Sequence, residues 1–127
     1  MLQQESKPII LVVDDQMGVR RLLYEAFQED NNNVIMASSG QEAIEKVKEN
    51  KPDIILMDMK MPGMNGLEAL QEMKKMYDDL LVIMMTAYGE LEIVAEAMKL
   101  GVKEYITKPF DINELRSLVK KVRQGSL

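Results

Sequence analysis

The sequence predicts an α/β fold in which five helices flank a doubly wound, five-stranded parallel sheet. Apolar runs begin near residues 8, 34, 53, 80 and 104, at intervals of roughly 25 residues. A segment with helical spacing of apolar residues follows each run, and such alternation is typical of parallel strands covered by helices on both faces. The run that precedes Asp58 is apolar without interruption, as expected for an inner strand.

The first strand–helix unit begins with the apolar run 8–13, which ends at the acidic pair Asp14-Asp15. Apolar residues then recur at helical spacing over about 17–28, which predicts an amphipathic helix. Three consecutive asparagines end this helix before the short strand predicted at 34–37.

The second and third units follow without a linker. Ser39 and Glu42 have the form of a capping box and predict the start of a helix that ends before Pro52. The strand predicted at 53–57 runs directly into Asp58, and a Pro-Gly pair then turns the chain.

The third helix is predicted to begin at Asn65, with Glu68 three residues later, and to end near Tyr77. The run 80–85 is the most apolar in the chain and predicts a fourth strand that stops at Thr86.

The last two helices are indicated by their ends. One begins at Gly89-Glu90 and is closed by Gly101 as a C-terminal cap. After a short strand at 105–107, Asp111 begins the final helix. Because this helix runs almost to the end of the chain, we expect one domain over 8–123 and no output domain.

Composition excludes several classes of protein. The 127 residues suit one domain, and with no cysteine we expect neither disulfides nor thiolate metal sites. No apolar run approaches the ~20 residues of a membrane helix, and the N-terminus lacks a signal-type region, so we infer a cytoplasmic protein. A net charge of −5 argues against a nucleic-acid surface. With no histidine, any metal needs oxygen ligands, which favours magnesium or calcium over zinc. We expect most of the twelve methionines to fill the core.

Four predicted strands end in polar residues, namely Asp14-Asp15, Asp58, Thr86 and Lys108. Each has an ordinary alternative. The aspartates could be helix-cap or turn residues, Thr86 could simply end a strand, and Lys108 could be a solvated loop lysine. The carboxyl ends of parallel strands lie along one edge, where ligands bind, so we expect the four groups to converge.

Such a cluster has a chemical logic. Three carboxylates repel one another, and a hard divalent cation removes that conflict. Asp58 can then act as a nucleophile toward phosphorus, since carboxylates form phosphoryl intermediates. Magnesium, the Lys108 ammonium and the Thr86 hydroxyl are suited to stabilise the negative charge of the transferring group.

These residues resemble a known family, the receiver domain of bacterial response regulators, over residues 8–123. The motifs that carry the likeness are Asp14-Asp15, Asp58 with Pro62-Gly63 and Gly66 after it, Thr86-Ala87, and Lys108-Pro109-Phe110. The resemblance implies a flavodoxin-like sheet in the strand order 2-1-3-4-5. It also implies that Asp58 is the phosphoryl acceptor and that Asp14, Asp15 and Asp58 bind Mg²⁺ with the main-chain carbonyl of Lys60.

The resemblance assigns roles around the acceptor as well. Lys108 would contact the phosphoryl group, and Thr86 would move to meet it. Tyr105 occupies the position of an aromatic switch, with a tyrosine packed in the strand as the alternative. The Lys108-Pro109 bond is often cis in the family.

A narrower likeness is to single-domain regulators of the Bacillus-type sporulation phosphorelay. The segments that carry it are Asp14-Asp15-Gln16, 18–23, 58–60, 85–91 and 108–112. It implies a monomer that takes a phosphoryl group from a sensor histidine kinase and passes it to a histidine phosphotransferase, with aspartyl-phosphate phosphatases as further candidate partners. Tyr105 and Asn65 depart from that pattern, and the first leaves partner choice open.

A relay needs a docking face beside Asp58. We expect it to comprise Gln16, Gly18, Val19, Leu22, Tyr88, Pro109 and Phe110. The alternative is that Val19 and Leu22 face the core. Lys60 and Tyr88, each two residues past a site residue, are hypothesised to shield the acyl phosphate from water.

Other classes fit less well. Phosphatases of the haloacid-dehalogenase type need a second aspartate two residues after the nucleophile, where this chain has Lys60. A flavodoxin-like electron carrier would need a phosphate-binding loop that the sequence lacks. A chemotaxis-type regulator, or a receiver cut from a transcription factor, would act by phosphorylation-dependent binding, and the sequence alone does not choose between binding and relay.

Overall fold

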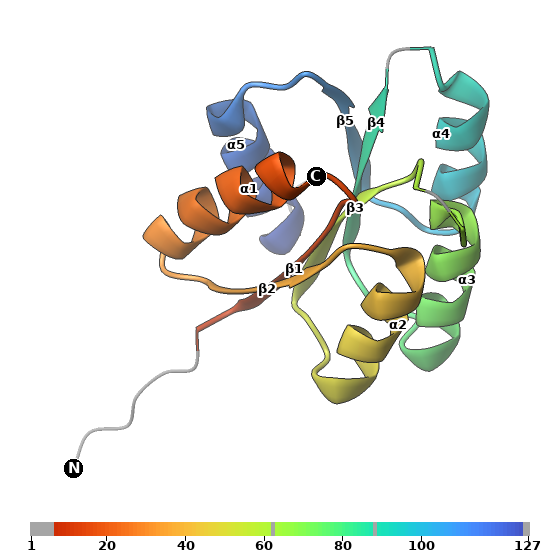
Figure 1. The fold of residues 1–127 in the computed structure, drawn as a ribbon, viewed down its shortest axis with the longest axis horizontal. Coiled ribbons are helices and arrows are strands. Elements are labelled where there is room, and N and C mark those ends of the chain that lie inside the picture. Colours follow the sequence, from red (N-terminus) through yellow and green to blue (C-terminus); the bar gives the residue numbers. More distant parts are fainter. Residues whose placement is uncertain (1–6, 62, 88, 126–127) are drawn as a thin grey trace.

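The computed structural model describes residues 7–61, 63–87 and 89–125. Five parallel strands form one sheet in the order β2-β1-β3-β4-β5, with helices on both faces (Figure 1). The strands are β1 (Ile9–Val13), β2 (Asn33–Ala37), β3 (Ile54–Asp58), β4 (Val82–Ala87) and β5 (Glu104–Lys108). The helices are α1 (Met17–Glu29), α2 (Gly40–Glu49), α3 (Gly66–Met76), α4 (Leu91–Lys99) and α5 (Ile112–Arg123). The predicted fold class and strand order are confirmed.

The sheet separates two apolar layers. Helices α1 and α5 cover one face, and α2, α3 and α4 cover the other (Figure 1). Alternate residues of β1 point into different layers, so that Ile10 and Val12 pack with α1 and α5, whereas Leu11 and Val13 pack on the opposite side. All five residues of β3 are buried, as the uninterrupted apolar run predicted. None of the described helices has the length and apolar character needed to cross a membrane.

The predicted helix starts are largely confirmed, with one exchange of partners. Asn65 and Glu68 form the complete capping box at the start of α3. At α2, Ser39 accepts the Glu42 amide, but the Glu42 carboxylate binds the amide and hydroxyl of Ser38 instead of the Ser39 amide. Ser38 therefore replaces Ser39 as the donor to Glu42 in the expected capping box.

Gly101 ends α4 as predicted. It has φ +100°, its amide donates to the Met98 carbonyl, and the Val102 amide donates to the Ala97 carbonyl. These are the two bonds of a Schellman motif, which requires a left-handed residue at the position of Gly101.

The predicted end of β4 was wrong by two residues. The strand contains Thr86 and continues to Ala87, because Thr86 pairs with Thr107 and Ala87 with Lys108 in β5. The apolar run alone placed the end before Thr86, whereas pairing with β5 extends the strand. Thr86 is consequently buried, with an exposed fraction of 2%.

Methionines mostly fill the core, as expected. Buried examples are Met57, Met59, Met61, Met73, Met84 and Met85. Met17 and Met98 are exceptions, since both side chains are substantially exposed on helix surfaces.

Candidate functional site

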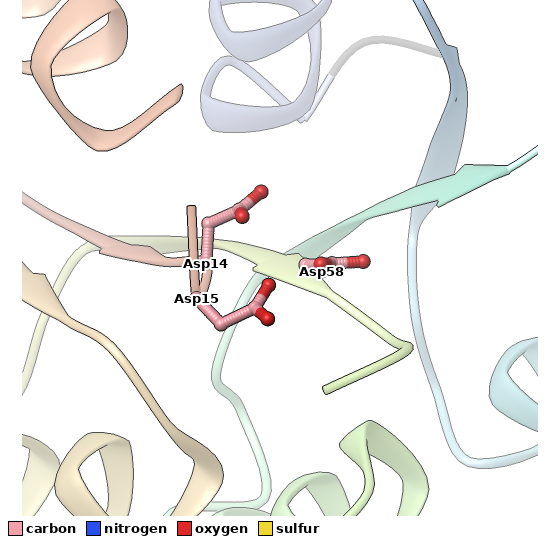
Figure 2. Close-up of side chains that lie close together, drawn as sticks. All are labelled: Asp14, Asp15 and Asp58. Carbon is pink, nitrogen blue, oxygen red and sulfur yellow. The ribbon is translucent and has the colours of Figure 1, made fainter. Parts of the chain in front are cut away.

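Three carboxylates meet at the carboxyl ends of β1 and β3 (Figure 2). Val13 pairs with Met57 across the two strands, so Asp14 and Asp58 follow side by side. Oxygen atoms from Asp14, Asp15 and Asp58 lie within 4.8 Å of one another. Asp14 and Asp58 are buried whereas Asp15 is exposed, so the cluster has both an inner and a solvent-facing side.

The Lys108 ammonium reaches this cluster from β5. Its Nζ lies 2.6 Å from Asp14 Oδ2 and 3.5 Å from Asp58 Oδ2. The Lys108-Pro109 peptide bond is cis, as the family resemblance implied. The predicted convergence of residues from β1, β3 and β5 is therefore present in the structure.

Main-chain contacts fix the two buried carboxylates. Asp14 Oδ1 accepts the Gln16 amide at 2.9 Å, and the Arg20 guanidinium donates to the Asp14 carbonyl at 2.8 Å. Asp58 Oδ1 accepts the Lys60 amide at 3.2 Å. Arg20 could not be singled out from the sequence, because an arginine on an amphipathic helix is most often a solvated residue.

Burial raises the pKa of Asp58, while the Lys60 amide and the Lys108 ammonium act in the opposite direction. Neighbouring Asp14 adds to the rise in pKa through like-charge repulsion. Closely spaced carboxylate oxygens that repel one another suit a hard cation such as Mg²⁺, because the cation favours the ionised form of each carboxylate. The Lys60 main-chain carbonyl as a further ligand stays a prediction.

Thr86 makes a hydrogen bond that its sequence pattern did not predict. Its hydroxyl donates to Glu90 Oε1 at 2.7 Å, and the Ala87 amide donates to the same oxygen at 2.8 Å. Burial acts to raise the pKa of Glu90, yet these bonds and nearby Lys60 hold it below the usual range. The sequence signal was only a glutamate four residues after Thr86, which the pattern assigned to the start of a helix.

Tyr105 lies on β5 with 41% of its surface exposed. It is therefore not packed in the core, which was the alternative to a switch position. Together with Thr86, Glu90 and Leu91 it lines a hollow of about 260 Å³ between the β4–α4 loop and β5.

The expected docking residues also gather at the site. A hollow of about 350 Å³ is lined by Gln16, Val19, Leu22, Lys108, Pro109 and Phe110. Leu22 is 50% exposed and does not face the core, whereas Val19 is half-buried against it. Gly18 is exposed on the same helix, and Tyr88 lies outside the described residues.

Comparison with known proteins identifies the family. The model of the response regulator receiver domain matches residues 10–120. The chain belongs to the response regulator receiver family. The receiver is 46% identical over 112 residues to sporulation initiation phosphotransferase F of Bacillus subtilis, covering 88% of this chain and 90% of that protein. It is 39% identical over 114 residues to the chemotaxis protein CheY of Thermotoga maritima, covering 89% and 95% of the two chains.

Solved structures agree with this assignment. The receiver matches the response regulator TrrA of Thermotoga maritima, solved in complex with Mg²⁺-BeF, with a TM-score of 0.81 at 36% identity, over 91% of this chain and 98% of that one. A receiver domain from Clostridium thermocellum matches with a TM-score of 0.86 at 33% identity, over 92% and 94% of the two chains.

Proposed function

We propose that this receiver is a phosphoryl-group carrier in a two-component phosphorelay. Asp58 accepts the phosphoryl group from a sensor histidine kinase and donates it to a histidine phosphotransferase. The observation that carries the proposal is the position of Asp58, with Lys108 at 3.5 Å and the oxygens of Asp14 and Asp15 within 4.8 Å.

Phosphoryl transfer to Asp58 is a single displacement at phosphorus. An oxygen of Asp58 attacks phosphorus, and the P–N bond of the donor phosphohistidine breaks with its electron pair going to the histidine nitrogen. The other ring nitrogen carries the proton, so the donor departs as neutral imidazole. Onward transfer is the same exchange in reverse, with a new histidine nitrogen as the nucleophile.

Charge placement gives each remaining group a role. The carboxylates of Asp14, Asp15 and Asp58 and the main-chain carbonyl of Lys60 would hold Mg²⁺, which neutralises charge on the phosphoryl oxygens. The Lys108 ammonium, already between Asp14 and Asp58, would pair with a phosphoryl oxygen. Thr86, at the end of the neighbouring strand, would donate to another once its hydroxyl turns toward Asp58.

Phosphorylation at Asp58 is tested with acetyl phosphate and Mg²⁺. We expect the wild-type chain to gain the mass of one phosphoryl group, the label to map to Asp58, and the Asp58→Asn variant to gain none. Asp53→Asn, on an exposed aspartate that precedes the same strand, is the matched control and should be phosphorylated normally. Equal phosphorylation of Asp58→Asn and wild type would exclude this function.

Relay, rather than phosphorylation-dependent binding, is supported by the likeness to the sporulation phosphotransferase. Control of sporulation is part of the proposal on the same ground. The second candidate, a chemotaxis-type regulator, is supported by the likeness to CheY and by the Thr86–Tyr105 hollow, where phosphorylation would shift a conformational equilibrium. Incubating the phosphorylated receiver with a panel of histidine phosphotransfer proteins separates them, because a relay protein loses its label rapidly to its partner and a binding regulator retains it.

Magnesium should stabilise the folded receiver. A ligand that binds only the folded state at about 100 times its Kd adds roughly 2.7 kcal/mol to the free energy of unfolding. We expect the thermal unfolding midpoint to rise with Mg²⁺ concentration. The rise should be lost in Asp15→Asn but retained in Glu25→Gln, which neutralises an exposed carboxylate on α1. The same rise in Asp15→Asn as in wild type would contradict the assignment of this ligand.

The docking hollow predicts a separate defect in transfer. Leu22→Ala removes an exposed apolar side chain from the wall of the hollow, so the rate of transfer from a cognate kinase should fall about tenfold. Phosphorylation by acetyl phosphate, which needs no docking protein, should be unchanged. Met98→Ala is the control, since it truncates an exposed apolar side chain on α4. Unchanged transfer to Leu22→Ala would remove Leu22 from the docking surface.

A further inference from the structure

The Glu90 side chain is hydrogen-bonded to the end of β4 that carries Thr86. One carboxylate oxygen, Oε1, accepts both the Thr86 hydroxyl at 2.7 Å and the Ala87 amide at 2.8 Å. The Glu90 side chain is only 11% exposed. The carboxylate is thus held beside the end of β4, just before α4 begins.

The bond to Glu90 prevents the Thr86 hydroxyl from donating to a second acceptor at the same time. A threonine hydroxyl has one hydrogen to donate, and here it is directed to Glu90. An ionised carboxylate is a strong acceptor and has no hydrogen to pass on. Thr86 therefore cannot donate to a phosphoryl group on Asp58 while it remains bound to Glu90.

The second oxygen of Glu90 ties the loop after β3 to the same point. Oε2 is buried and has no hydrogen-bond partner among the described residues. The nearest cation is the Lys60 ammonium, 3.7 Å away, and Lys60 follows Asp58 by two residues. Glu90 thus links the loops that follow β3 and β4 in the unphosphorylated receiver.

We propose that Glu90 is a positioning residue that holds Thr86 in its resting orientation and competes with the phosphoryl group for the Thr86 hydroxyl. The inference rests on the proposed function and deepens it. Phosphorylation has to break the Thr86–Glu90 hydrogen bond, so Glu90 shifts the equilibrium toward the resting state. Removing the carboxylate shifts it toward the state that binds a phosphoryl group.

The affinity for beryllofluoride in the presence of Mg²⁺ tests this equilibrium, because beryllofluoride takes the place of the phosphoryl group. We expect Glu90→Ala to bind it about tenfold more tightly than wild type. Glu90→Gln keeps an oxygen acceptor but loses the charge, so its affinity should be intermediate. Glu92→Ala, which removes an exposed carboxylate from the first turn of α4, should bind like wild type.

A double-mutant cycle shows whether Glu90 acts through Thr86. Thr86→Val keeps the shape of the side chain without its hydroxyl, and in that background Glu90→Ala should have no further effect on affinity. A gain that persists in the Thr86→Val background, or an affinity of Glu90→Ala equal to or below that of wild type, overturns the inference. If Glu90→Ala does not fold, Glu90→Gln is judged by the same criteria.

Failure of the inference is distinguishable from failure of the proposed function. Wild-type receiver that binds beryllofluoride at Asp58 while the Glu90 variants show no gain leaves the phosphoryl carrier intact and removes only Glu90. Wild-type receiver that binds no beryllofluoride, and gains no phosphoryl group from acetyl phosphate, removes both.

Discussion

Lys108→Met should lower the free energy of unfolding by about 3 kcal/mol in the absence of Mg²⁺. Asp14 is fully buried, and its closest cation is the Lys108 ammonium at 2.6 Å. Removing one partner of a buried ion pair leaves the other charge uncompensated, which costs more than the pair itself contributes. Asp58, 3.5 Å from the same ammonium, adds like-charge repulsion once Lys108 is gone. Chemical denaturation of the wild type and variant measures the difference.

Phosphorylation and stability should respond differently to Mg²⁺ in this variant. The cation supplies positive charge to Asp14 and Asp58 and should restore part of the lost stability. It does not replace the ammonium that we propose to pair with a phosphoryl oxygen, so phosphorylation by acetyl phosphate should remain slower by about 100-fold.

Lys121→Met is the matched control for Lys108→Met. Its ammonium pairs with Glu104 at 3.4 Å on an exposed part of the surface, where such a pair is worth about 0–1 kcal/mol. Both stability and phosphorylation should therefore stay close to wild type. Equal losses of stability and phosphorylation rate in the two variants would show that the contact of Lys108 with the acidic cluster does not cause the effect.

The sequence predicts the fold well because buried parallel strands leave a simple pattern. The run that becomes β3 is buried on both faces and is apolar at every position before Asp58. The site follows from the same pattern, since strands that run in parallel end at one edge. Register then places Asp14 beside Asp58, and the pairing of β4 with β5 places Thr86 and Lys108 nearby.

The details that the sequence did not predict depend on choices between near-equivalent partners. The end of β4 is set by its pairing with β5, which follows α4 in the sequence. The apolar run of β4 does not encode that partner. Glu42 selects Ser38 over Ser39, and the two serines are chemically identical. Glu90 accepts the Thr86 hydroxyl across a loop turn, where spacing alone carries no directional information.

Partner choice is still less accessible from the pattern. The fold constrains buried side chains, whereas the exposed ones at the docking hollow, such as Leu22, are free to vary with the partner. The strand ends therefore predict the acidic site, whereas the exposed residues of the docking hollow do not predict a particular partner.

Gly66→Ala should be strongly destabilising, because Gly66 lies where the loop after Asp58 returns against β3. A Cβ at this position would lie 2.6 Å from Met59 Cα and 2.8 Å from Met59 Sδ. The thioether can move, but the Cα belongs to the backbone directly after Asp58. Forcing atoms into a well-packed site costs about 1–3 kcal/mol, and we expect the upper part of that range in chemical denaturation.

The consequence should extend to the site. Relieving the contact requires the Met59 backbone or the start of α3 to shift, and the Gly66 amide also donates to the Met59 carbonyl. Since Asp58 immediately precedes Met59, we expect the folded fraction of the Gly66→Ala protein to bind Mg²⁺ more weakly and to be phosphorylated more slowly.

Gly18→Ala separates this steric effect from the general effect of replacing a glycine. Both glycines lie in the first turn of a helix, but a Cβ at Gly18 would meet no atom within 4 Å. Alanine favours the helix by about 0.5–1 kcal/mol over glycine, so Gly18→Ala should be neutral or more stable than wild type. Similar behaviour of the two variants would mean that the approach of Gly66 to Met59 does not limit the residue at this position. Opposite signs would show that the turn after Asp58 tolerates only glycine because Met59 leaves no room for a Cβ at position 66.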